Sequence, residues 1–242
     1  MIALSFAAMA NFTTWTVCKH KPIEKLTPNL WRVSGTMPNA ETQQRQMVLA
    51  RMADGRVIVH NAVALDDNEM AELEAWGTPS VIFVPNAYHR QDAGIWKQRY
   101  PQAKVITPAG AKKRVNTAVA VDAVTEEAPK DDTVRLFPID GLPGESVLEV
   151  KSPDGVSLTF CDAILNVPKL GFPMGFFLGP TGQVSTPRVV RWIALKNKKA
   201  FAAQLEKLAE TPGLNRVMFG HGRPITDDPK GALLAVVKQL VG

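Results

Sequence analysis

Between residues 67 and 118 the sequence alternates helical patterns with short apolar strand patterns, and this alternation restricts the fold more than any other feature. The segment DNEMAELEAWG opens with Asp67 and closes with Gly77, which is typical of a helix, and residues 79–86 (PSVIFVPN) predict a buried strand. AGIWKQRYP then predicts a helix that stops at Pro101, AKVITPA another strand, and GAKKRVNTA a short helix. A parallel sheet with helices packed on it accounts for this order.

Short β-branched runs lie on both sides of that region. Residues 29–37, 47–52 and 56–63 predict an antiparallel meander before it, and residues 134–139, 146–151 and 156–164 predict a second antiparallel set after it. A loop rich in Pro and Gly (166–185), a long helix from Thr186 to about Ala209, a strand (216–219) and a closing helix (228–241) complete the chain. We expect one α/β domain over residues 1–242, with an irregular N-terminus at residues 1–28.

Composition and charge narrow the functional classes. A chain of 242 residues with 45% hydrophobic residues has enough apolar side chains for a large core. The net charge is +5, but the basic residues are scattered and the densest group, residues 196–199, falls on a predicted helix, so we expect no nucleic-acid partner.

Two separated cysteines predict no disulfide framework and favour a cytoplasmic location. Apolar runs are interrupted by charges or prolines, and the apolar residues 1–12 lack the basic start of a secretory signal. We therefore expect a cytoplasmic protein with no membrane partner.

Four segments place ligand-capable side chains directly after predicted strands, where open α/β sheets have their sites. If they meet, they form a centre of two imidazoles and three carboxylates, and such an oxygen-rich set suits Mn²⁺, Fe²⁺ or Mg²⁺ as well as Zn²⁺. A divalent metal there lowers the pKa of bound water and supports hydrolysis of an ester, amide, thioester or phosphodiester. Asp162 would anchor the metal and orient the water, and Asp92 would be the general base if it is not a ligand. The predicted ligands are His89, Asp92, Glu145, Asp162 and His221.

Each of these residues also has a simpler interpretation. His89 and Asp92 are equally suited to capping the helix that begins near Ala93, and Glu145 is typical of an exposed turn. His60 ends a strand and is a weaker substrate-binding candidate, because a lone strand histidine is more often structural. Tyr88 and Arg90 would bind an anionic substrate group or form ordinary loop surface. Cys161 has no basic neighbour in the sequence, which argues against a catalytic thiolate.

The order of these segments resembles that of the metallo-β-lactamase superfamily, whose motifs are HxHxDHxG, PGH, a strand ending GDA, and GHG. AYHRQDAG retains the second histidine of the first motif as His89 and its glycine as Gly94. The others correspond to Pro143-Gly144-Glu145, Cys161-Asp162-Ala163 and Gly220-His221-Gly222, so that the resemblance covers about residues 29–224. The sequence is also similar to an uncharacterised bacterial branch of this superfamily. In that branch the first loop is also replaced and a strand ends in His, as VIVHNAV does. The resemblance implies a four-layer αββα sandwich with the site along one edge.

Three functions fit this pattern. The first is a metal-dependent hydrolase of a small molecule with an atypical Zn, Mn or Fe centre, and the second is a metal-free or weakly metal-binding pseudoenzyme or binding protein of the same fold. The third is an oxygen-handling or redox protein, if iron occupies the site. The loop from Val167 to Gly182, with Phe176 and Phe177, predicts either an apolar wall over the site or the contact of a homo-oligomer.

Overall fold

The structure is a computed structural model that describes residues 11–37 and 40–242. Within these residues the first sheet has seven strands, and their order in space follows their order in the chain. Neighbours from β1 to β4 are antiparallel and those from β4 to β7 are parallel, which confirms the predicted meander and the parallel region. The strands are β1 (Glu24–Thr27), β2 (Leu30–Met37), β3 (Ala40–Arg51), β4 (Arg56–His60), β5 (Thr78–Phe83), β6 (Lys104–Thr107) and β7 (Ala123–Val124).

The second sheet comes from the later part of the chain and has four strands within the described ranges. Its strands are β8 (Val134–Ile139), β9 (Leu142–Ser152), β10 (Gly155–Thr159) and β11 (Leu214–Met218), in the order β11-β10-β9-β8. β8, β9 and β10 are antiparallel as predicted, and β11 adds to β10 in parallel. β10 and β11 therefore end at the same edge of the sheet.

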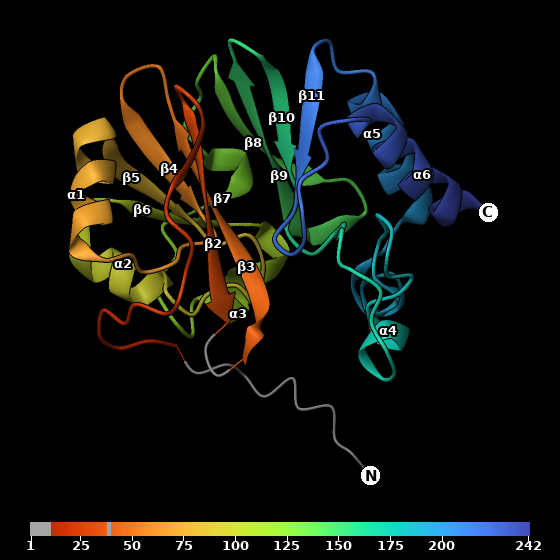
Figure 1. Ribbon diagram of the computed structural model, residues 1–242, viewed down its shortest axis with the longest axis horizontal. Coiled ribbons are helices and arrows are strands. Elements are labelled where there is room, and N and C mark those ends of the chain that lie inside the picture. The colour runs from red at the N-terminus through yellow and green to blue at the C-terminus, as the bar shows by residue number, and fades with distance from the viewer. Residues whose placement is uncertain (1–10, 38–39) are drawn as a thin grey trace.

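Helices cover the outer face of each sheet, and the inner faces pack on each other (Figure 1). On the first sheet lie α1 (Asp67–Trp76), α2 (Ala93–Arg99) and the short α3 (Lys112–Val115), and on the second lie α5 (Lys198–Ala209) and α6 (Pro229–Val241). The layer between the sheets includes Leu30 and Phe83 from the first sheet and Leu148 and Met218 from the second. The chain is thus an α/β protein with the layer order helix, sheet, sheet, helix.

The long helix predicted from Thr186 is interrupted. A π-helical turn, η3 (Val190–Ala194), is followed by the extended residue Leu195, and α5 begins only at Lys198. The reason is local, because the Asn197 side chain accepts from the Ala200 amide and so caps a new helix, which asparagine does well. The amides of Lys196 and Asn197 meanwhile donate to the carbonyl of Gly141 in place of a helical partner.

Other boundaries differ from the sequence expectations by a few residues. β1 falls within the N-terminal stretch that was expected to be irregular, whereas the expectation for residues 1–10 lies outside the described part of the chain. The loop 166–185 contains a short helix, α4 (Met174–Phe177), and two further turns are 3₁₀ helices, η1 (Ala109–Ala111) and η2 (Thr125–Glu127). Among the described residues, no helix combines the length and the apolar character required to cross a bilayer.

The layer between the sheets yields a stability prediction. Leu148→Ala removes a fully buried side chain from that layer, and we expect it to lower the free energy of unfolding by about 2–5 kcal/mol. Ile193→Ala, at a position that is 69% exposed, is the control and should change it by about 0.5 kcal/mol or less. Urea denaturation measures both, and equal effects would contradict this account of the layer.

Candidate metal centre

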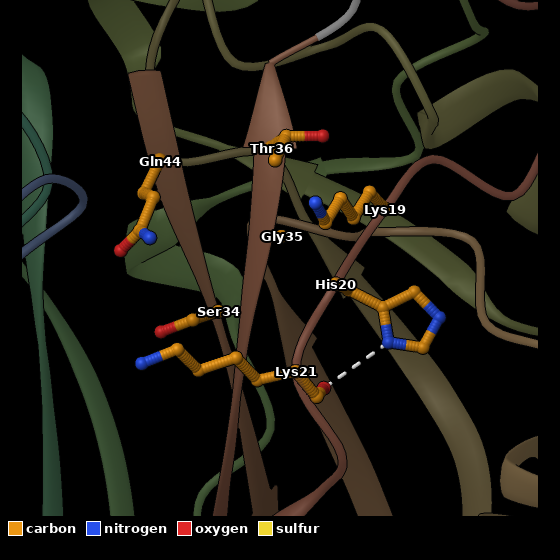
Figure 2. Close-up of a pocket in the computed structure, with 7 residues that line it drawn as sticks. All are labelled: Lys19, His20, Lys21, Ser34, Gly35, Thr36 and Gln44. Carbon is orange, nitrogen blue, oxygen red and sulfur yellow. Dashed lines mark hydrogen bonds between the residues drawn. The ribbon is translucent and has the colours of Figure 1, made fainter. Parts of the chain in front are cut away.

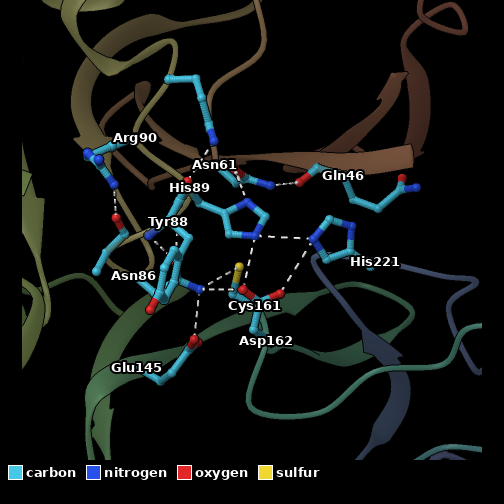
Figure 3. Close-up of polar contacts among 12 residues, drawn as sticks. Gln46, Asn61, Asn86, Tyr88, His89, Arg90, Glu145, Cys161, Asp162 and His221 are labelled. Carbon is cyan, nitrogen blue, oxygen red and sulfur yellow. Dashed lines mark hydrogen bonds and ion pairs between the residues drawn. The ribbon is translucent and has the colours of Figure 1, made fainter. Parts of the chain in front are cut away.

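The ends of three strands bring three of the candidate residues to one edge of the molecule. The loop after β5 carries His89, and the segments after β10 and β11 carry Asp162 and His221. Because β4 and β5 are parallel, as are β10 and β11, the residues that follow each pair leave the sheet at a common edge. Figure 3 shows the side chains of His89, Asp162 and His221 directed toward one another.

These three side chains form a compact group. His89 Nε2 lies 3.1 Å from Asp162 Oδ2, and His221 Nε2 lies 3.5 Å from Asp162 Oδ1. The two Nε2 atoms are 3.2 Å apart, and one ligand atom from each of the three residues lies within 4.8 Å of the others. His89 is buried, whereas the side chains of Asp162 and His221 are each 23% exposed, so the group is reached from solvent on one side.

Asn61 fixes the orientation of the His89 ring. Its amide nitrogen donates to the Gln46 carbonyl at 2.7 Å, so its Oδ1 is the atom that faces His89 Nδ1 at 2.9 Å. Since that oxygen only accepts, Nδ1 carries the ring proton and Nε2 presents a lone pair to Asp162 when the ring is neutral. Asn61 has a φ of 58°, a conformation that asparagine tolerates, and it directly follows His60, the last residue of β4.

His221 is held in the same way from the other sheet. Its Nδ1 lies 2.7 Å from the backbone carbonyl of Gln44, which accepts only, so its Nε2 also presents a lone pair in the neutral ring. The flanking glycines are required by packing. A Cβ on Gly220 would lie 2.8 Å from Cys161 Sγ, and Gly222, with φ +97°, has no room for one beside the Asn166 carbonyl.

Two facing lone pairs and a carboxylate form an electron-rich centre. With both Nδ1 atoms donating outward, neither neutral ring can donate to the other across the 3.2 Å gap. A cation between the three groups, either a metal ion or an added proton, satisfies them together. Two imidazole nitrogens and one carboxylate oxygen form a donor set that divalent Zn, Fe and Mn accept.

Asn86 is a site residue that the sequence analysis missed. Its Oδ1 accepts from the amides of Tyr88 and His89, and its Nδ2 donates to Glu145 Oε1 at 2.7 Å and to Asp162 Oδ2 at 2.9 Å. It therefore shapes the loop that carries His89 and holds two carboxylates at once. Its position at the end of PSVIFVPN was the available signal, since Asn after a strand commonly caps a turn.

Charge and burial shift the pKa values of the two acidic groups of the site in opposite directions. Burial alone raises the pKa of Asp162, but His89, His221 and the Asn86 hydrogen bond together hold it well below its usual range. Burial and the neighbouring Asp162 charge raise the pKa of Glu145 well above its ordinary value. Burial lowers the pKa of His221, because it disfavours the charged imidazolium, and the Asp162 charge opposes this shift. The two shifts of the carboxyl groups have opposite directions, so Asp162 is the more acidic of the two.

Glu145 lies beside the three converging residues and is not one of them. It reaches Asp162 through Asn86, and its Oε2 is buried with no hydrogen-bond partner among the described residues. It is not the exposed turn residue that the simpler interpretation predicted, because it lies within β9 and is buried. Cys161 is buried, and burial raises the pKa of its thiol, which agrees with the expectation that it is no thiolate nucleophile.

The structure places Asp92, predicted as a ligand or general base, with a different partner. Its carboxylate forms a buried ion pair with Arg45 and accepts from the Ala64 amide at 3.0 Å. It stands at the start of α2 without a side-chain cap hydrogen bond, so the helix-cap interpretation is not supported either. Both oxygens are occupied by these contacts, and Asp92 lies outside the group of three converging ligands.

The weaker substrate-binding candidates have separate environments. His60 is completely buried against Phe83, and burial with the nearby His89 lowers its pKa to about 3, so it is a neutral core residue that no substrate reaches. Arg90 is buried and donates to the Ala87 carbonyl within its own loop. Tyr88 is exposed, with the Arg114 guanidinium 5.3 Å from its ring centroid, and is the only one of these three open to a ligand.

The loop predicted to overhang the site exposes part of its apolar surface to solvent. Phe172 is 88% exposed, and Phe176 packs on Phe177 and Trp192 at ring distances of 5.3 and 5.8 Å. The base of the loop adjoins the site, because Asn166 pairs with Gly222, one residue after His221. A cavity of about 350 Å³ opens there, lined by Asn166, Val167, Pro168, Gly182 and Arg223. The homo-oligomer contact stays a prediction.

Comparison with models of known protein families and with curated proteins found no match to this chain. The geometry of the site therefore carries the functional argument.

The ion pair of Asp92 gives a prediction that separates structural from functional carboxylates. Arg45→Met leaves Asp92 buried without its cation and should lower the free energy of unfolding by about 3–5 kcal/mol. Arg56→Met, which breaks the exposed pair with Asp54, is the matched control and should cost about 1 kcal/mol or less. The double change Arg45→Met with Asp92→Leu should recover much of the loss in urea denaturation. No recovery would contradict a purely structural role for the pair.

Proposed function

We propose that this chain is a metal-dependent hydrolase whose divalent ion is held by His89, Asp162 and His221. One observation carries the proposal: two imidazole Nε2 atoms and an ionised carboxylate, brought from distant parts of the sequence, converge within 4.8 Å. Each ring is oriented by a separate acceptor on its Nδ1 atom, Asn61 for His89 and the Gln44 carbonyl for His221. Such outward acceptors are the usual support of metal-binding histidines.

We further propose that the fold is the αββα sandwich of the metallo-β-lactamase superfamily. The layer order supports this, as does the position of the group at the edge where β10 and β11 end. The segments Cys161-Asp162-Ala163 and Gly220-His221-Gly222 supply two of the three converging side chains, in the order that the resemblance implies. His89, from the altered first loop, supplies the third.

A divalent ion supplies hydroxide at neutral pH by lowering the pKa of water bound to it, and the residues of the chain provide the rest of the chemistry. Asp162 gives the negative charge of the donor set and is fixed by Asn86. Three protein ligands leave positions free for water and substrate, as hydrolytic metal sites require. Glu145 shares the Asn86 amide nitrogen with Asp162, and its raised pKa makes it the candidate proton donor to a leaving group.

Two alternatives have support of their own. A donor set of two histidines and one carboxylate is also the pattern of non-haem Fe²⁺ centres, so an oxygen-handling protein is the second candidate function. A pseudoenzyme of the same fold fits if the facing imidazoles share a proton in place of a metal. The metal content of the protein as purified separates these alternatives, because Zn or Mn favours the hydrolase and Fe the second candidate.

Asp162→Asn tests the ligand assignment, because it keeps the size of the side chain but removes the anion. We expect this variant to bind one equivalent less of divalent metal than the unaltered protein, measured by elemental analysis after gel filtration. Hydrolysis of a panel of esters, thioesters and phosphodiesters should fall by at least about 100-fold, since a whole ligand is lost. Asp140→Asn, an exposed aspartate on the turn between β8 and β9, is the control and should leave both unchanged. Equal metal content in the two variants would show that Asp162 is not a metal ligand.

Asn61→Gly tests the support of His89. Glycine accepts the positive φ of this position, so the change removes the Oδ1 acceptor without straining the backbone. We expect metal affinity to fall by about 10- to 100-fold in isothermal titration. Asn61→Asp keeps an acceptor opposite His89 Nδ1 and should retain most of the affinity. If the glycine variant binds metal as tightly as the unaltered chain, Asn61 does not orient a ligand.

A further inference from the structure

A second group of metal-ligand side chains lies apart from the centre described above. Among the described residues, two groups of three histidine or carboxylate ligand atoms lie within 4.8 Å of one another, and the second consists of His20, Asp66 and Glu69. His20 belongs to the N-terminal segment before β1, whereas Asp66 and Glu69 belong to the N-terminal end of α1. The group therefore joins two elements that are distant in sequence.

The backbone of the N-terminal segment determines which way His20 points. Residues 19–21 run antiparallel to β2: Lys21 donates its amide to the Ser34 carbonyl, and Thr36 donates to the Lys19 carbonyl. Successive side chains in an extended segment point to opposite faces. Figure 2 shows Lys19 and Lys21 directed to the side of Ser34 and Gln44, and His20 directed to the other side. Residues 19–21 line a cavity of about 200 Å³ together with residues of β2 and β3, and the His20 ring also meets Glu69 of α1.

The hydrogen bonds leave one unshared atom on each of two side chains. His20 Nδ1 lies 3.1 Å from the Lys21 carbonyl, which only accepts, so Nδ1 carries the proton and Nε2 of the neutral ring has a free lone pair. Glu69 Oε1 accepts from the Ile23 amide at 3.0 Å, which leaves Oε2. That Oε2 is buried with no hydrogen-bond partner among the described residues, and it lies 3.4 Å from His20 Nε2. The side chains of His20 and Glu69 are only 9% and 14% exposed.

Asp66 completes the group from the solvent side. Its Oδ1 caps α1 by accepting from the amides of Asn68 and Glu69, and among the described residues its second oxygen takes no part in the cap. Asp67, in the same turn, is exposed and forms an ion pair with Arg99 at 3.9 Å, so it is not part of the group. The group therefore consists of one imidazole and the two carboxylates of Asp66 and Glu69.

We propose that His20, Asp66 and Glu69 form a second, structural divalent-metal site that fastens the N-terminal segment to α1. One imidazole nitrogen and two carboxylate oxygens are ligands that Zn²⁺ accepts. The site is separate from the proposed catalytic centre in its residues, and its role is to hold residues 11–23 against the outer helix of the first sheet. Trp15, whose Nε1 donates to the Leu65 carbonyl, adds a second fastening of the same segment.

The test counts Zn²⁺ equivalents bound by the full chain, by elemental analysis after gel filtration with added Zn²⁺. The variant Glu69→Gln keeps an acceptor for the Ile23 amide but loses the carboxylate, and His20→Ala removes the imidazole. Lys19→Ala, on the opposite face of the same segment, is the matched control. We expect Glu69→Gln and His20→Ala each to lose one equivalent and Lys19→Ala to lose none. Glu69→Gln or His20→Ala binding as much Zn²⁺ as Lys19→Ala would overturn the proposal.

Combination with Asp162→Asn separates this site from the catalytic one. The Asp162→Asn variant should keep one equivalent, and Asp162→Asn with Glu69→Gln should keep none. If Asp162→Asn changes nothing while Glu69→Gln removes all bound Zn²⁺, the second site stands and the proposed catalytic centre fails.

Thermal unfolding with and without a chelator is an independent readout. The chelator should lower the midpoint of Asp162→Asn by about 5–10 °C, as expected for loss of a ligand present at about 100 times its dissociation constant. The chelator should not shift the midpoint of the double variant Asp162→Asn with Glu69→Gln. The alternative is a simple ion pair between protonated His20 and Glu69. It predicts that His20→Ala lowers the unfolding midpoint equally with and without the chelator and leaves the amount of bound Zn²⁺ unchanged. That result would also overturn the proposal.

Discussion

The apolar contact between the two sheets is the interaction on which the candidate centre depends. His89 and its support Asn61 come from the first sheet, whereas Asp162 and His221 come from the second. Residues such as Phe83 and Leu148 set the separation of the sheets, and with it the distance between the rings of the two histidines. Close-packed interiors resist small displacements, so this layer holds the ligands in register without a direct covalent link.

Backbone and amide groups then set the direction of each ligand. Asn61, Asn86 and the Gln44 carbonyl together engage both imidazoles and both acidic side chains of the site. Asn86 makes the most of these bonds, since it accepts from two amides and donates to two carboxylates. These hydrogen bonds restrict side-chain rotation, because turning one member leaves a buried group unpaired. Arg45 and Asp92 extend the same principle, since their ion pair anchors the strand β3 beside the loop that carries His89.

Much of the fold could be predicted from the sequence, because hydrophobic periodicity is a local property. The capped helix α1, the strand β8 and the closing helix α6 agree with their predicted limits within a residue or two. The break before α5 could not be predicted, since it depends on Gly141 accepting from Lys196 and Asn197 across the fold. For the site, strand-end position indicated His89, Asp162 and His221, but the partners of Asp92 and Glu145 are set by tertiary contacts with Arg45 and Asn86. Residue type alone does not distinguish a ligand from a structural carboxylate.

The division of the centre between the two sheets has a consequence for how the chain acquires it. Every strand that contributes to the first sheet lies before residue 125, and every strand of the second lies after residue 133. One imidazole therefore belongs to each half, and neither half alone contains a complete donor set. An ion that binds all three side chains recognises only the assembled molecule and so favours the docked halves over the separated ones. Cofactor capture and the last step of folding would then be one event, and affinity for the ion would report how well the two halves have docked.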